Sequence, residues 1–255
     1  TPGQRLSFLE QDHFKYDDYT VLDTVIMGNT RLYEIMKEKE AIYAKEDFTE
    51  EDGNKASELE AEFADMNGWE AESDAAQLLN GLGITTDLHY KNMSELNGSE
   101  KVKVLLAKAL FGNPDILLLD EPTNYLDKEH IDWLKRYLLD YENAFILISH
   151  DIPFLNSVIN IIYHMDNHEL NRYVGDYNKF MEVYEMKQAQ QKAAYDKQQK
   201  EIADLKDFVA RNKERVATRN MAMSRQKKLD NMDMIELAEK KAKPEFYFKI
   251  ARRPG

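Results

Sequence analysis

The sequence of 255 residues predicts an α/β fold, with a parallel β-sheet and helices, followed by a long helical segment. Two short apolar runs, Ile116–Leu119 and Ala144–Ser149, have the length and composition of strands buried in a parallel sheet. A helical pattern separates them, and an alternation of strand, helix and strand is typical of α/β folds. Beyond residue 178 turn residues become rare, and the remaining thin apolar stripe predicts a long helix or a helical hairpin.

The first third of the chain predicts one strand and a helical arm. Residues 5–12 alternate between apolar and polar side chains, as a half-buried strand does. Apolar residues then recur at helical spacing over residues 22–43 and 54–82, with an acidic, Gly-containing turn between the two stretches. Because residues 31–66 are rich in Glu and Lys, we expect them to form a helical arm insertion that projects into solvent.

The middle of the chain supplies the other predicted elements. A helix over residues 94–111 ends at a Gly-Asn-Pro sequence, which is a strong stop signal. Another helix is predicted over residues 128–141, between the two apolar runs. Residues 160–165 and 169–173 predict a hairpin that closes the domain.

Composition excludes several classes of protein. The chain has no Cys, which excludes a disulfide scaffold, a thiolate metal site and a Cys nucleophile. It has no run of about 18 apolar residues, so the sequence predicts no membrane insertion. An apolar fraction of 43% is ordinary for a protein with a sizeable core.

Charge is spread unevenly, and this changes what the total of −13 means. Residues 187–255 contain 18 Lys and Arg against 10 Asp and Glu, a net charge of +8, so residues 1–186 carry −21. An acidic body followed by a basic segment is compatible with a nucleic-acid partner, whereas a uniformly acidic protein is not. We therefore expect a partial α/β domain over residues 1–178 and a basic helical linker over residues 179–255.

Two carboxylates follow the first buried run directly. Asp120 and Glu121 emerge where the strand ends, at the edge where α/β sheets bind ligands. One carboxylate can hold Mg²⁺, and the next can orient or deprotonate an attacking water molecule. A buried Asp-Glu pair after four aliphatic residues is costly unless it is used, so we treat this pair as the strongest functional signal.

Weaker signals lie on either side of that pair. A Gly at a helix start, as in Asn97-Gly98-Ser99, exposes backbone N–H groups to a phosphate, although the same residues also make an ordinary helix cap. His150 ends the second apolar run, where its ring can donate a hydrogen bond to a γ-phosphate. The neighbours Ser149, His150 and Asp151 cannot form a hydrolase triad, because triad members come from distant segments.

In this order the residues resemble the motifs of the ATP-binding cassette (ABC) ATPases. The matches are Gln11 for the Q-loop, LNGSE (Leu96–Glu100) for the signature usually written LSGGQ, ILLLDEP (Ile116–Pro122) for Walker B, Asn124–Asp127 for the D-loop and His150 for the switch histidine. Within this superfamily the chain resembles the bacterial short-arm subgroup of the ABC-F class, twin-cassette proteins that have no membrane domain and act on ribosomes. The sequences EPTNYLD and YVGDYNKF, the arm after the Q-loop and the charged linker carry this closer resemblance.

The resemblance implies a role for each matched residue. Glu121, His150 and Gln11 would be catalytic: Glu121 would act on the attacking water, and His150 would contact the γ-phosphate of ATP. Asp120 and Gln11 would hold Mg²⁺. The residues expected to face the ATP bound by a second cassette of the same polypeptide, or to couple the two sites, are Asn97, Gly98, Ser99, Glu100 and Asp127.

The sequence departs from the family pattern in two respects. No Gly-x-x-x-x-Gly-Lys-Ser/Thr sequence is present, so we expect an internal fragment of a first cassette that lacks its P-loop and its twin and that is inactive alone. The signature is also altered, because Asn97, Ser99 and Glu100 replace the usual Ser, Gly and Gln. A side chain at position 99 hinders the close backbone approach that a Gly permits.

The basic linker predicts contact with RNA, because phosphates attract clustered cations with little sequence specificity. The candidate RNA-binding residues are Lys206, Arg211, Lys213, Arg215, Arg219, Arg225, Lys227 and Lys228. Together with the resemblance they imply the ribosome and transfer RNA as partners and a cytoplasmic location. A merely solvated helix is the alternative interpretation of this linker. The acidic arm does not favour RNA, and a protein contact is the better expectation for it.

Three functions compete at this point. The first is an ABC-F translation factor that binds ATP, Mg²⁺ and the ribosome, favoured by the linker and the absence of an apolar span. The second is the ATP-binding subunit of a membrane transporter, which would normally end soon after the switch histidine or carry a regulatory domain. The third is an interaction fragment without catalytic activity.

Overall fold

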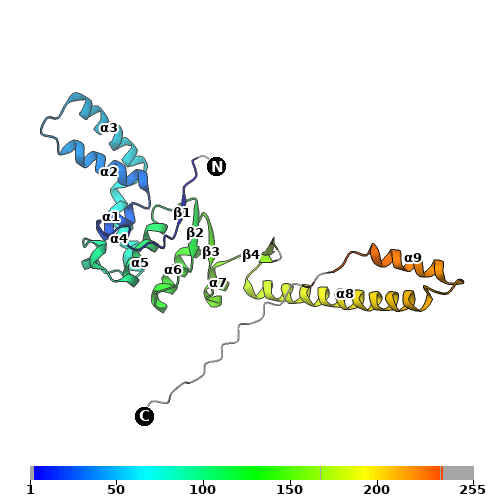
Figure 1. The fold of residues 1–255 in the computed structure, drawn as a ribbon. Coiled ribbons are helices and arrows are strands. Elements are labelled where there is room, and N and C mark those ends of the chain that lie inside the picture. The colour runs from blue at the N-terminus through cyan, green and yellow to red at the C-terminus, as the bar shows by residue number, and fades with distance from the viewer. Residues whose placement is uncertain (1–2, 167, 236, 238–255) are drawn as a thin grey trace, which may run out of the picture. The chain divides into compact units, whose positions relative to one another are not determined.

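The computed structural model describes residues 3–166, 168–235 and 237, and the chain divides into two compact units between Ile159 and Asn160 (Figure 1). The domain boundary at residue 178 that the sequence predicts stays a prediction. The end of the predicted linker, residues 238–255, lies outside the described residues.

The first unit contains a three-stranded parallel sheet, as the sequence predicts. Its strands are β1 (Leu6–Phe8), β2 (Ile116–Asp120) and β3 (Ala144–Ile148), in the order β1-β2-β3. The predicted first strand over residues 5–12 is too long, because only three of its residues pair with β2. Both neighbours run parallel to β2, so the carboxyl ends of all three strands lie at one edge.

Helices follow and separate these strands. They are α1 (Val21–Ile26), α2 (Thr30–Tyr43), α3 (Glu50–Asp65), α4 (Ala71–Gly81), α5 (Gly98–Leu110), α6 (Lys128–Leu139) and α7 (Ile152–Val158), with single 3₁₀ turns at Gly68–Glu70, Thr86–Leu88 and Met93–Glu95. Helix α5 lies at the centre, since it packs against α1, α4 and β1. Leu105 and Leu110 on this helix are almost completely buried, so α5 contributes much of the hydrophobic core.

The helices cover only one face of the sheet in the described residues, which corrects the prediction that β3 is buried throughout. Phe145 and Leu147 pack against the core. Ile146 and Ile148 point the other way and are 60% and 59% exposed. Because successive side chains of a strand alternate between faces, one row of β3 is buried and the other is open.

Two predicted helices are interrupted for local reasons. The helix expected over residues 22–43 breaks at Gly28, where an added Cβ would lie 2.2 Å from the backbone oxygen of Lys108. Asn29 then caps α2 by accepting from the backbone N–H of Leu32. The helix expected over residues 54–82 breaks at Asn67, whose φ of 53° is left-handed. Such breaks depend on tertiary contacts that periodicity does not show.

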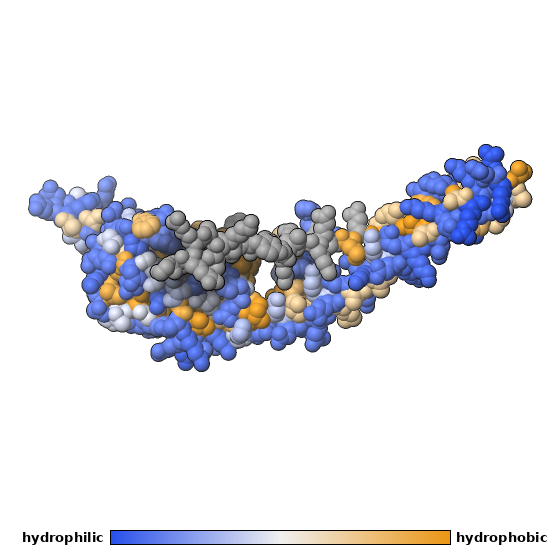
Figure 2. Space-filling model, turned by 60° about the horizontal axis from the view of Figure 1, so that its bottom comes forward, coloured by the Kyte–Doolittle hydropathy of each residue, from blue (hydrophilic) through white to orange (hydrophobic). Residues whose placement is uncertain are grey.

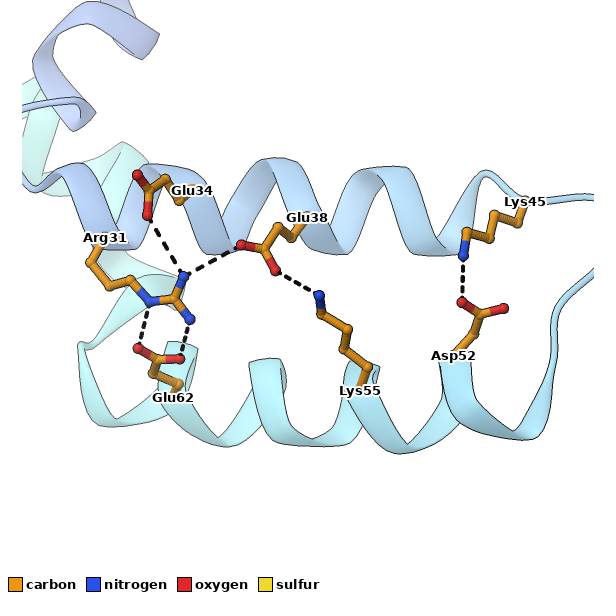
Figure 3. A network of polar contacts seen from close by, with 7 residues as sticks. All are labelled: Arg31, Glu34, Glu38, Lys45, Asp52, Lys55 and Glu62. Carbon is orange, nitrogen blue, oxygen red and sulfur yellow. Dashed lines mark hydrogen bonds and ion pairs between the residues drawn. The ribbon is translucent and has the colours of Figure 1, made fainter.

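Helices α2 and α3 form the predicted arm, and ion pairs join them along its length (Figure 3). The guanidinium of Arg31 donates to both oxygens of Glu62, at 2.7 and 2.6 Å, and also contacts Glu38. Lys55 reaches the second oxygen of Glu38 at 3.4 Å. Hydrogen bonding to Glu62 raises the pKa of Arg31, and the same contact lowers the pKa of Glu62. This bidentate ion pair of Arg31 and Glu62 helps to fix the relative orientation of the two helices.

The second unit consists of a β-hairpin and a helical hairpin. Strands β4 (Ile161–Asp166) and β5 (Glu169–Val174) pair in antiparallel fashion, and α8 (Tyr177–Asn212) packs against α9 (Arg219–Asp230). The predicted β-hairpin and the predicted helical hairpin are therefore both present, and the role of the helical hairpin as a linker stays a prediction. Figure 2 shows a mostly hydrophilic surface over the helical hairpin. No helix in the described part of the chain has the length and apolar character needed to cross a membrane.

Replacing Leu105 by Ala is expected to lower the free energy of unfolding by about 2–5 kcal/mol, because it leaves a cavity in the core. Leu105 is 1% exposed. The control is Leu139→Ala at the end of α6, where the side chain is 55% exposed and a change within about 0.5 kcal/mol is expected. Urea denaturation followed by circular dichroism measures both. Equal midpoints for the two variants would contradict the described core.

Candidate functional site

The candidate site begins where the central strand of the sheet ends. Asp120 is the last residue of β2, and the backbone N–H of Glu121 donates to the oxygen of Ile148 at 2.8 Å. Glu121 has a φ of 49°, in the left-handed region, where a non-Gly residue costs of the order of 1–3 kcal/mol. The chain therefore leaves the sheet abruptly at Glu121, beside the end of β3.

Glu121 and His150 form a pair across the ends of two neighbouring strands. Nδ1 of His150 lies 2.8 Å from Oε2 of Glu121, and the backbone N–H of His150 donates to the same oxygen at 3.4 Å. The hydrogen bond to Glu121 and the charge of that carboxylate raise the pKa of His150. The pair therefore holds a proton next to the carboxylate that the sequence predicts to act on water.

Gln11 approaches Asp120 from the segment after β1. Its Nε2 lies 3.5 Å from Oδ2 of Asp120, and turning the amide would present Oε1 there instead. A carboxylate and an amide oxygen are ligands that suit Mg²⁺. In the described residues no three Asp, Glu, His or Cys side chains are grouped to hold a metal. The residues fit Mg²⁺ only with further ligands from phosphate and water, as is usual for this ion.

An open groove runs beside these polar groups. Gln11 and Asp120 line one part of it, and the exposed row of the sheet, including Phe8, Ile146 and Ile148, lines the rest. Lys15 also borders it. The structure thus brings together four of the predicted site residues, Gln11, Asp120, Glu121 and His150, at one edge of the sheet.

The predicted signature residues lie at the N-terminus of α5. Oδ1 of Asn97 accepts from the backbone N–H of Glu100 at 3.0 Å and from Oγ of Ser99 at 2.7 Å, and the Glu100 carboxylate accepts from the Asn97 N–H. These bonds make a capping box, the ordinary interpretation of such a sequence. Gly98 has no atom within 4 Å of an added Cβ, so this turn is open. Among the described residues, no hydrogen bond or ion pair joins the turn Asn97–Glu100 to Gln11 or Asp120.

Asp127 caps α6 in a similar way. Its Oδ1 accepts from the backbone N–H of His130 at 3.2 Å and lies 2.5 Å from Nδ1 of the same residue. The backbone hydrogen bond from His130 lowers the pKa of Asp127. Its predicted role in coupling two ATP sites stays a prediction.

The eight predicted RNA-binding residues divide into two groups. Three are occupied by contacts within the hairpin: Arg211 pairs with Asp207, Lys228 pairs with Glu201, and Arg225 lies 3.5 Å from the ring centre of Phe208. Among the described contacts, the other five make no ion pair: Lys206, Lys213, Arg215, Arg219 and Lys227. Three of these five, Lys213, Arg215 and Arg219, lie in or next to the turn between α8 and α9.

Two family models described as ABC transporter match the chain, one over residues 1–124 and the other over residues 163–248. The chain belongs to the ATP-binding cassette family. The matched ranges include Gln11, Leu96–Glu100 and Ile116–Pro122, which resemble cassette motifs in sequence, and residues 163–248, which contain the helical hairpin of α8 and α9.

Curated relatives agree with this assignment. The uncharacterized ABC transporter ATP-binding protein YfmM of Bacillus subtilis (strain 168) is 67% identical over 184 residues, which is 72% of this chain and 36% of the relative. YkpA of the same strain, described in the same words, is 51% identical over 237 residues, 93% of this chain and 44% of the relative. The probable ATP-binding protein YbiT of Escherichia coli O157:H7 is 41% identical, over 92% of this chain and 44% of the relative. The chain spans less than half the length of these relatives.

Sequence reasoning missed a set of residues beside Gln11. Glu10 accepts hydrogen bonds from Lys108 and Tyr16, and Lys101 pairs with Asp17. A signal was present, because Lys101 and Lys108 are seven residues apart and fall on the apolar face of α5. A Lys on the buried face of a helix usually has a partner.

The contact between Glu121 and His150 predicts a raised pKa for His150, which a titration can measure. In the 255-residue chain, the NMR titration midpoint of His150 is expected above the ordinary histidine pKa of 6.5 and should fall when Glu121 is replaced by Gln. Because the pair favours the protonated ring, its stabilising effect is present below that ordinary pKa and is lost as the pH rises through the raised pKa of His150. The other five histidines serve as internal controls, and an unchanged His150 midpoint in Glu121→Gln would contradict the pairing.

Proposed function

We propose that these residues are part of a longer twin-cassette ATPase of the ABC-F type, which binds the ribosome when it holds ATP. The observation that carries the proposal is the convergence of Gln11, Asp120, Glu121 and His150 at the carboxyl edge of a parallel sheet. This chain contributes one half of a composite site, and a P-loop and a second cassette elsewhere in the polypeptide contribute the rest.

The chemistry is divided among the four residues. Asp120 and Gln11 would hold Mg²⁺, whose positive charge would offset the negative charge of the ATP phosphates. Glu121 would orient the attacking water and accept its proton. His150, whose ring lies beside Glu121, would donate a hydrogen bond to the γ-phosphate when ATP is bound. The capped turn Asn97–Glu100 would face the nucleotide of the second cassette, and Asp127 would couple the two sites.

The helical linker supports the ribosome as partner. The alignments with the relatives YkpA and YbiT cover 93% and 92% of the chain, so they extend into the sequence of the helical hairpin as well as that of the cassette. Cations without an internal ion pair gather at the turn between α8 and α9, where they are free to contact RNA phosphates. The acidic arm does not suit RNA, and we assign it to a protein contact.

The membrane transporter remains the alternative, and one experiment separates the two functions. The full-length Glu121→Gln variant is expected to bind ATP without hydrolysing it and to co-sediment with ribosomes in ATP but not without nucleotide. Glu142→Gln, an exposed carboxylate on the loop before β3, is the matched control and should hydrolyse ATP like the wild type. Absence of co-sedimentation at low salt, with a membrane protein co-purifying instead, would favour the transporter subunit.

A second experiment tests the tip of the linker. Reversing Lys213, Arg215 and Arg219 to Glu in the full-length protein should weaken ribosome binding and flatten its dependence on salt. If each cation contacts one phosphate, the slope of log affinity against log salt should fall by about 2–3.

The matched control reverses the same number of charges on the exposed shaft of α8, at Lys192, Lys197 and Lys200. These changes should leave most of the slope in place. An equal loss of slope in both triple variants would show a general charge effect and would contradict a contact at the tip.

A further inference from the structure

The segment that carries Gln11 is attached to helix α5 by two ion pairs. Nζ of Lys108 lies 2.9 Å from Oε1 of Glu10, and Nζ of Lys101 lies 2.5 Å from Oδ1 of Asp17. Three of these four side chains are largely buried: Lys101 is 6% exposed, Lys108 13% and Glu10 15%. The contacts are therefore part of the interior and differ in kind from the exposed pairs of the arm.

Glu10 is held from several sides. The hydroxyl of Tyr16 donates to Glu10 at 2.8 Å, and Lys15 lies 3.4 Å from the same oxygen, Oε2. The hydrogen bonds from Lys108 and Tyr16 satisfy the oxygens of the Glu10 carboxylate in this largely buried position. Pulling Glu10 away from Lys108 would leave a partly buried charge without its partner, which is strongly unfavourable.

One helix thus connects two parts of the proposed site. Glu10 directly precedes Gln11, whose amide reaches Asp120, and Lys108 lies near the C-terminal end of α5. The other end of the same helix is the capped turn at Asn97 and Gly98. About ten residues separate Gly98 from Lys108, and a regular helix of that length is about 15 Å long and stiff.

We propose that Glu10 and Lys108 are positioning residues that attach the segment of Gln11 to α5, so that the Gln11 amide is held beside Asp120 where Mg²⁺ would bind. The pair of Lys101 and Asp17 is a second attachment of the segment after Gln11 to the same helix. This inference rests on the proposed ATPase function, and it adds residues that the sequence motifs do not contain. Neither lysine touches the reacting atoms in this assignment.

The test measures metal binding to the ATP-bound full-length protein, by electron paramagnetic resonance with Mn²⁺ in place of Mg²⁺, together with steady-state ATP turnover as a function of Mg²⁺ concentration. Lys108→Met is expected to raise the Mg²⁺ concentration for half-maximal rate by about 10-fold or more, as loss of an outer partner of a metal ligand does. Lys108→Arg keeps the charge and should restore most of the affinity. Glu10→Gln, which keeps the shape and the contact with Tyr16, should reproduce the effect of Lys108→Met with a smaller risk of misfolding.

The decisive comparison uses Gln11→Ala. If Lys108 acts through Gln11, then Lys108→Met should cause no further change in the Mg²⁺ dependence of a protein that already lacks the Gln11 amide, because effects within one coupled unit do not add. Equal fold-changes in both backgrounds, or no rescue by Lys108→Arg, would overturn the inference while leaving the ATPase function intact. A wild-type protein without Mg²⁺-dependent turnover would refute the proposed function, and this inference with it.

Discussion

Strand β2 imposes the constraint on which the candidate site depends. It is the middle strand, and both neighbours pair with it in parallel, so three chain segments must end at the same edge. Gln11 and His150 follow the ends of β1 and β3, and Asp120 is the last residue of β2. Strand pairing brings these residues together although more than a hundred residues separate Gln11 from Asp120. The left-handed backbone at Glu121 then turns the chain away from the sheet.

Much of this arrangement is predictable from the sequence because it depends on local patterns. An aliphatic run followed by Asp120 and Glu121 predicts both a buried strand and the position of two carboxylates at its end. The order of the motifs predicts which segments meet, and the relatives and family models support the cassette. The roles of the individual residues remain proposals, since geometry shows their proximity and not their chemistry.

Other features depend on contacts between distant segments, so local sequence patterns do not predict them. Gly28 interrupts a periodic helix because it approaches the backbone of Lys108, which lies far along the chain. The open row of β3 is equally hidden, since Ile146 and Ile148 have the composition of buried strand residues while helices cover only the other face. The position of Lys108 on the apolar face of α5 indicates a buried partner, but local patterns do not show that this partner is Glu10.

The basic residues of the helical hairpin are of two kinds, those with a partner inside the hairpin and those without an ion pair in the described contacts. Arg225 lies over Phe208 and Lys228 pairs with Glu201, so these side chains hold α9 against α8. Lys213 and Arg215 lie past the end of α8 without an ion pair in the described contacts. A count of basic residues cannot separate the two groups, because the partners of Arg225 and Lys228 come from the opposite helix.

The length of α8 has a mechanical consequence. A helix of 36 residues is about 54 Å long, and it starts beside Gly175, whose φ of 124° is a conformation that side chains rarely allow. Rotation at that point by about 6° would move the far end by about 6 Å, roughly the rise of one helical turn. A small change of backbone angle near Gly175 would therefore be magnified at the basic turn between α8 and α9.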